Sequence, residues 1–118
     1  MTRVVLDPRV LRAAGWAALA VRSARRQLRG RPVHAVRVPD PPALPRRAER
    51  GVNAVLRRLE PSCLERSLVL QRWLAAQGEQ RTVVVGVSSP REFRAHAWLD
   101  GEPLPAGTEF HEIARLAP

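Results

Sequence analysis

Apolar residues at helical spacing mark the first half of the chain. Asp7 followed by Pro8 is typical of a helix start, and apolar positions then recur every three or four residues to Leu28. Gly30 predicts the end of this helix. A second helix is expected from about Arg46 to Leu59, where one apolar stripe runs between arginines.

Residues 30–45 between these helices are rich in proline and predict an irregular connector. Within it, Val33 to Val38 is expected to be a short extended piece. A third helix is expected over about 62–77, because Ser62 and Glu65 fit a capping box. This helix is apolar on more than one face and should be largely buried.

The second half of the chain changes to strand patterns. Residues 81–87 are rich in β-branched side chains and predict a buried strand, and residues 93–99 alternate as a second strand. Asp100-Gly101 is a hairpin signal, so a third strand is expected from Pro103.

This order of elements predicts an α+β fold, with N-terminal helices followed by a small antiparallel sheet packed on the third helix. We expect one domain overall. Within it, residues 1–45 form the N-terminal helix and proline-rich connector, and residues 46–118 form the core.

Composition narrows the function classes. The net charge is +9 and every basic residue is arginine, which suggests nucleic-acid binding. However, aromatic residues make up 4% and Tyr is absent, so platforms for base stacking are scarce and no nucleic-acid ligand is expected. No segment is long and apolar enough for a membrane span, so membrane contact is not expected. The expected location is the cytoplasm.

The single cysteine is the strongest chemical signal. Cys63 falls at the expected start of the third helix, where unpaired N–H groups favour a thiolate, and His96 falls later on the second expected strand. A thiolate and an imidazole are what a cysteine hydrolase needs. Each residue alone also has a structural reading, Cys63 as a small buried hydrophobe and His96 as a strand residue. No cofactor or metal site is expected.

Two motifs carry a resemblance. The run CLERSLVLQRWL at 63–74 resembles the C-L-x-R-S-L-x-L-Q-R-x-L signature of the lasso-peptide maturation proteases, a transglutaminase-like family. The run FRAHAWLDGEP at 93–103 is similar to the family's F-x-A-H-A-W-V…D-G-x-P hairpin, and Gly78 and Gly86 fit the segment between them. The match is close over residues 46–104 and loose over the N-terminal helix.

The resemblance implies a papain-like, transglutaminase-like cysteine protease core. Cys63 is then the nucleophile, His96 the general base and acid, and Leu64 with its neighbours part of the oxyanion hole. The implied activity is removal of the leader from a ribosomally made precursor peptide. The implied partners are that precursor, a separate leader-recognition protein and an ATP-dependent lasso cyclase. The N-terminal helix or the connector is a candidate docking surface for the recognition protein.

One departure from the family concerns the carboxylate that orients the histidine. The family usually has an aspartate on the strand after the histidine hairpin, whereas this chain reads Leu-Pro-Ala-Gly at 104–107. Glu109 and Asp100 are the candidate substitutes, and a backbone carbonyl or no orienter at all are the alternatives. Glu102 is expected to be a solvated hairpin residue.

The remaining candidate residues each have a catalytic and a structural interpretation. Trp98 is expected on the same strand face as His96, as an active-site wall or a core residue. Trp73 is expected in the core. Arg66 is either a charge near the thiolate or a salt-bridged surface residue, and His34 and His111 are weak candidates for catalysis. Acyl transfer on the same site and a non-catalytic scaffold remain alternative functions.

Overall fold

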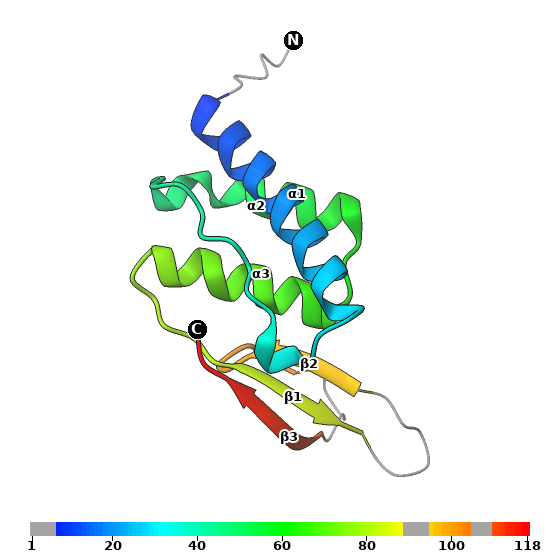
Figure 1. The fold of residues 1–118 in the computed structure, drawn as a ribbon. Coiled ribbons are helices and arrows are strands. Elements are labelled where there is room, and N and C mark those ends of the chain that lie inside the picture. Colours follow the sequence, from blue (N-terminus) through cyan, green and yellow to red (C-terminus); the bar gives the residue numbers. More distant parts are fainter. Residues whose placement is uncertain (1–6, 89–94, 105–109) are drawn as a thin grey trace.

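The computed structural model describes residues 7–88, 95–104 and 110–118. Three helices lie above a small sheet (Figure 1). The elements in chain order are α1 (Pro8–Leu28), the 3-10 turns η1 (Val33–Ala35) and η2 (Arg46–Ala48), α2 (Glu49–Leu59), α3 (Cys63–Ala76), β1 (Val83–Val87), β2 (Ala95–Leu99) and β3 (His111–Leu116). The predicted α+β class is confirmed.

The helix termini follow the signals in the sequence. The Asp7 carboxylate accepts a hydrogen bond from the Arg9 N–H at 2.9 Å, and Pro8 occupies the first turn of α1. The second predicted helix begins as η2 and continues as α2.

The expectation of an extended piece over Val33 to Val38 is wrong for its first half. Residues Val33–Ala35 form a 3-10 turn, in which the Ala35 N–H donates to the Pro32 carbonyl at 2.9 Å and the Val36 N–H to the Val33 carbonyl at 3.2 Å. Pro32 starts this turn with extended backbone angles, and Val36 returns the chain to an extended conformation.

The core lies between the three helices and the upper face of the sheet. Helix α1 packs mainly against α2 and also against α3 (Figure 1). Its tryptophan, Trp16, lies against Trp73 of α3, with ring centroids 6.0 Å apart. The buried side chains of α1 belong to the same apolar cluster as those of α2, α3 and the sheet, so α1 is built into the core.

The sheet is antiparallel in the order β2-β1-β3. The expected hairpin between the second and third strands is therefore wrong: β3 begins at His111 and pairs with β1. The expected start of the second strand at 93–94 lies outside the described residues. A bulge between Val85 and Gly86 leaves Ile113 of β3 out of register.

Helix α3 explains this strand order. The Ala97 N–H of β2 points away from β1 and donates to the Cys63 sulfur at the start of α3. The next outward N–H of β2, that of Leu99, donates to the Glu102 carboxylate at 2.9 Å. Because this outer edge of β2 is occupied, a third strand pairs at the free edge of β1.

The opposite end of the sheet is also fastened to α3. The buried Gln71 side-chain amide of α3 donates to the Arg81 carbonyl at 2.9 Å and to the Leu116 carbonyl at 2.7 Å.

None of the helices in the described part of the chain has the length and hydropathy that a membrane span requires.

We predict that Gly51→Ala destabilises the fold while Gly15→Ala does not. A Cβ at Gly51 of α2 meets the Val10 carbonyl oxygen of α1, so the two helices must move apart. The free energy of unfolding should fall by about 1–3 kcal/mol in urea denaturation. Gly15 is also helical, but a Cβ added there would have no neighbouring atom within 4 Å, so alanine should raise the free energy of unfolding by up to about 1 kcal/mol. Equal effects of both changes would contradict this packing.

Candidate active site

The site is built on the first turn of α3. The Ser62 hydroxyl accepts from the Glu65 N–H at 3.1 Å, and the Glu65 carboxylate accepts from the Ser62 N–H at 2.9 Å. This confirms the predicted capping box. Cys63 is the first residue of the helix and is half-buried. The reciprocal cap holds the backbone on both sides of the thiol.

Arg25 of α1 joins this turn to the other helices. Its Nε donates to Glu65 Oε1 at 3.1 Å, and its Nη2 donates to the Leu59 carbonyl, the last residue of α2, at 3.0 Å. Between α2 and α3, Glu60 has a positive φ of 45°, which permits the sharp turn into Pro61 and Ser62. One arginine therefore connects α1, the end of α2 and the cap of α3.

The thiol of Cys63 contacts the histidine strand. The Ala97 N–H donates to Cys63 Sγ at 3.3 Å, and Ala97 directly follows His96. Because bond lengths separate the Ala97 nitrogen from the His96 Cα by only about 2.5 Å, the sulfur lies within about 6 Å of that Cα. The structure thus brings together the two backbone positions predicted for the nucleophile and the base.

The His96 ring lies on the face of β2 opposite to Ala97. Strand side chains alternate, so Ala97 packs into the core while His96 and Trp98 share the other face. The imidazole stacks on Trp98, with ring centroids 5.8 Å apart, and on Phe110, at 5.2 Å. Within the described residues no hydrogen bond joins the His96 ring to Cys63 or to a carboxylate.

Gly86 makes room for these rings. It is the β1 partner of His96, and a Cβ there would lie 2.9 Å from the Trp98 ring and 3.1 Å from Phe110 Cβ. The absence of a side chain at Gly86 lets Trp98 and Phe110 approach the sheet beside the histidine. Trp98 therefore lies beside His96 and outside the buried core, and its reading as an active-site wall stays a prediction.

The described carboxylates near the hairpin are paired with arginines. Asp100 lies about 13 Å along the strand from His96 and pairs with Arg115 at 3.2 Å, so it does not orient the imidazole. Glu112, which is level with Gly86 on β3, also binds Arg115, at 2.7 Å. The pKa of Arg115 is raised by its hydrogen bonds, first to Glu112 and then to Asp100. Glu109, the other candidate orienter, lies outside the described residues.

Glu102 is not merely a solvated hairpin residue. Its carboxylate accepts the Leu99 N–H and pairs with Arg66 of α3 at 3.4 Å. Arg66 therefore matches its salt-bridged reading, and this pair connects the first part of α3 to the end of β2.

The weaker candidates make no hydrogen bond to Cys63 in the described part of the chain. His34 is on η1 in the connector, and His111 is an exposed residue at the start of β3. Trp73 is fully buried and donates its indole N–H to Glu49 at 2.8 Å, which confirms its place in the core.

In the described part of the chain, no His, Cys, Asp and Glu side chains gather in a group of three that could hold a metal.

Comparison with protein families decides the class. The family model of the transglutaminase-like superfamily matches residues 4–115. The chain belongs to this superfamily. Its members are typically cysteine-dependent enzymes, among them cysteine peptidases and acyltransferases. No curated protein and no solved structure matches the chain significantly.

Three supporting residues of this transglutaminase-like site were not predicted from the sequence. Arg25 is one arginine among many on α1, and only the helix packing shows its bonds. Phe110 is distant from His96 along the chain, and its contact depends on the strand order. Gly86 did have a signal, because a glycine within a β-branched strand often marks a close approach.

We predict that Arg25→Met loosens the turn that carries Cys63. The change removes both bonds to Glu65 and Leu59. Because Arg25 is partly exposed, the free energy of unfolding should fall by only about 1 kcal/mol. Arg29→Met is the matched control, since Arg29 is exposed and has no ion pair among the described residues. If the free energy of unfolding fell equally in both variants, the loss of a positive charge would explain the effect, and the two bonds of Arg25 would not.

We also predict that Gly86→Ala displaces the ring cluster formed by His96, Trp98 and Phe110. The added methyl overlaps the Trp98 ring, so the near-UV circular dichroism of the tryptophan should change and stability should fall by about 1–3 kcal/mol. Gly30→Ala meets nothing within 4 Å and should leave the spectrum unaltered. An unaltered spectrum for Gly86→Ala would argue against the cluster.

Proposed function

We propose that the chain is a cysteine peptidase that removes the leader segment from a ribosomally made lasso-peptide precursor. Cys63 is the nucleophile and His96 the general base and acid. The observation that carries the proposal is the bond from the Ala97 N–H to Cys63 Sγ, which seats a helix-start cysteine beside the histidine position. Membership of a superfamily of cysteine-dependent enzymes and the two motifs at 63–74 and 93–103 support it.

The nucleophile is favoured by its surroundings. The positive end of the α3 dipole and the Ala97 N–H both stabilise negative charge on the sulfur. The imidazole of His96 is attached at a Cα within about 6 Å of the sulfur, and in the proposed reaction it leaves its stack on Trp98 and Phe110 and turns to the thiol. It then accepts the thiol proton and forms a thiolate–imidazolium pair.

The reaction follows from these positions. The thiolate attacks the carbonyl carbon of the leader–core bond, forming a C–S bond and an oxyanion. The oxyanion collapses, the C–N bond breaks, and the His96 imidazolium protonates the departing amine of the core peptide. Water, deprotonated by His96, then attacks the thioester. The C–S bond breaks and restores the Cys63 thiolate beside the His96 imidazolium, and the leader leaves as a carboxylic acid that releases its proton to solvent.

Free backbone amides at the start of α3 are suited to the oxyanion. The capping box uses the Glu65 N–H, and the Arg66 N–H donates to the Ser62 carbonyl at 2.9 Å. The amides of Cys63 and Leu64 have no partner in the described part of the chain, as expected for the first turn of a helix. Donors fixed before the reaction stabilise a developing oxyanion most effectively.

The proposal includes two partner proteins and a location. A leader-recognition protein delivers the precursor, and an ATP-dependent cyclase closes the ring on the new N-terminus. Leu11 and Leu19 of α1 are 52% and 64% exposed, so this helix offers apolar surface for the recognition protein. We place the reaction in the cytoplasm, where a single reactive thiol stays reduced.

Acyl transfer is the second candidate, because the superfamily includes acyltransferases and the thioester can react with an amine in place of water. The third candidate is a non-catalytic scaffold. It is favoured by the pairing of Asp100, Glu102 and Glu112 with arginines, which leaves His96 without a carboxylate partner among the described residues.

Intact mass separates these candidates. A precursor incubated with the recognition protein and wild-type chain should be cut at one position, with the mass of one water added across the two products. Cys63→Ala should abolish cleavage, and His96→Ala should lower it by about a hundredfold or more. Arg58→Ala, an exposed change on α2, should cleave normally. Products carrying an added amine would indicate transfer, and maturation by Cys63→Ala would indicate the scaffold.

A further inference from the structure

Arg37 lies where three surface hollows meet, on the side of the molecule formed by α1 and the connector. The first runs between the connector and α3 and has a volume of about 510 Å³. A second, of about 450 Å³, lies at the end of α1, and a third, of about 530 Å³, lies along α1 beside Pro39. Arg37 lines all three hollows, and we call them together the Arg37 surface.

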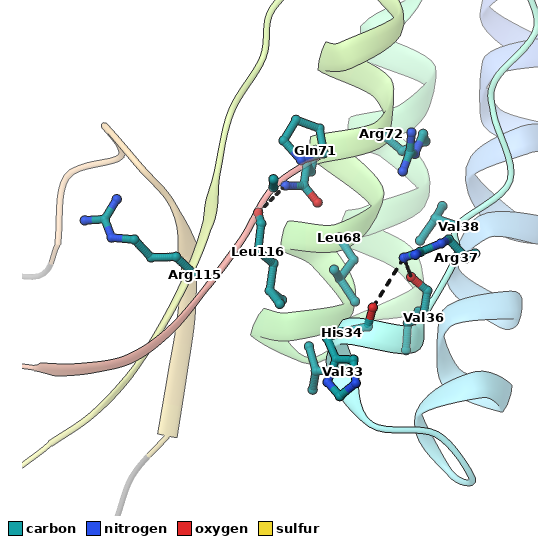
Figure 2. A pocket seen from close by; sticks show the side chains of 12 residues that line it. Val33, His34, Val36, Arg37, Val38, Leu68, Gln71, Arg72, Arg115 and Leu116 are labelled. Carbon is teal, nitrogen blue, oxygen red and sulfur yellow. Dashed lines mark hydrogen bonds between the residues drawn. The ribbon is translucent and has the colours of Figure 1, made fainter.

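This surface is strongly cationic. Besides Arg37, its hollows are lined by Arg22, Arg26, Arg31 and Arg72. No described Asp or Glu lines any of the three. Arg115 also borders the hollow between the connector and α3, but its side chain turns away from Arg37 and Arg72 (Figure 2), towards Asp100 and Glu112.

Arg37 is held in place by neutral groups alone. The Gln27 side-chain amide binds both the N–H and the carbonyl of Arg37, each at 2.8 Å. The guanidinium donates to the carbonyls of His34 and Val36 at 3.3 and 3.4 Å (Figure 2). These bonds orient Arg37 without neutralising it, and no ion pair reaches it from the described residues.

Arg72 adds a second incompletely satisfied cation to the hollow between the connector and α3. Its Nε is buried and has no hydrogen-bond partner among the described residues, and its Nη1 reaches only the exposed Asp40, at 3.5 Å. A guanidinium has several donors and binds carboxylates in pairs, so this side chain retains capacity for an anion. Apolar side chains of Val33, Val36 and Leu68 line the same hollow.

We propose that the Arg37 surface binds an extended acidic segment of the peptide substrate. This segment is separate in the peptide from the bond that Cys63 attacks. Aspartate or glutamate side chains would pair with Arg37, Arg26 and Arg72, and an apolar side chain would enter the valine-lined hollow. This inference rests on the proposed peptidase function, since it names the substrate feature that the enzyme recognises away from the cleaved bond.

An acidic peptide fits the lining better than a nucleic acid does. Among the described residues, no Trp, Phe or Tyr lines the three hollows, so the large aromatic side chains that usually stack on bases are absent from the described lining. Two of the three hollows combine arginine with valine or leucine, which suits the charged and apolar side chains of an extended peptide.

The test is fluorescence anisotropy with the full-length chain. The probe is a fluorescein-labelled peptide of alternating Glu and Leu, and the comparison probe has Gln in place of Glu. Arg37→Gln should weaken binding of the acidic peptide by about tenfold. Arg26→Gln, an exposed change that leaves the backbone bonds of Arg37 intact, should weaken it severalfold. Arg57→Gln removes the same charge from α2, outside the Arg37 surface, and should have an effect below about twofold.

Three results would overturn the proposal: no binding of the acidic peptide by wild type, equal losses in Arg37→Gln and Arg57→Gln, or tighter binding of a single-stranded oligonucleotide of the same charge. Cys63→Ala should bind the acidic peptide as wild type does. If wild type binds the acidic peptide but does not cleave the precursor, the proposed function is contradicted and the Arg37 surface is not. If Arg37→Gln cleaves the precursor as fast as wild type, the Arg37 surface is contradicted and the proposed function is not.

Discussion

The first turn of α3 is the junction on which the rest of the structure depends. Its cap is closed by Ser62 and Glu65, and Glu65 is in turn bound by Arg25 of α1. From the same turn, the Cys63 sulfur accepts the Ala97 N–H of β2. The helices and the sheet therefore meet at the single cysteine of the chain, and the bonds that stabilise the fold also position its thiol.

The strand order is a consequence of this junction and shapes the histidine environment. With the outer N–H groups of β2 bound by Cys63 of α3 and by Glu102, the last strand pairs beside β1. This arrangement places Phe110 over Gly86 and against the His96 ring. Among the described residues, His96 is thus held by aromatic packing, while the nearby carboxylates pair with arginines.

The arginines serve two physical purposes. Some form ion pairs that connect elements, as Arg66 does with Glu102 and Arg115 does with Asp100. Others, such as Arg37 and Arg26, have no acidic partner in the described part of the chain and gather beside α1. A net charge of +9 alone does not distinguish these roles. The distinction depends on which arginines face carboxylates after folding.

Local signals in the sequence determined the helix starts, the α+β order and the positions of Cys63 and His96, because caps, apolar periodicity and motifs act within a few residues. Only the tertiary structure decided the order β2-β1-β3, the role of Arg25 and the loss of Asp100 as an orienter. These depend on which strand edge α3 covers and on contacts between residues far apart in the chain, which no local pattern encodes.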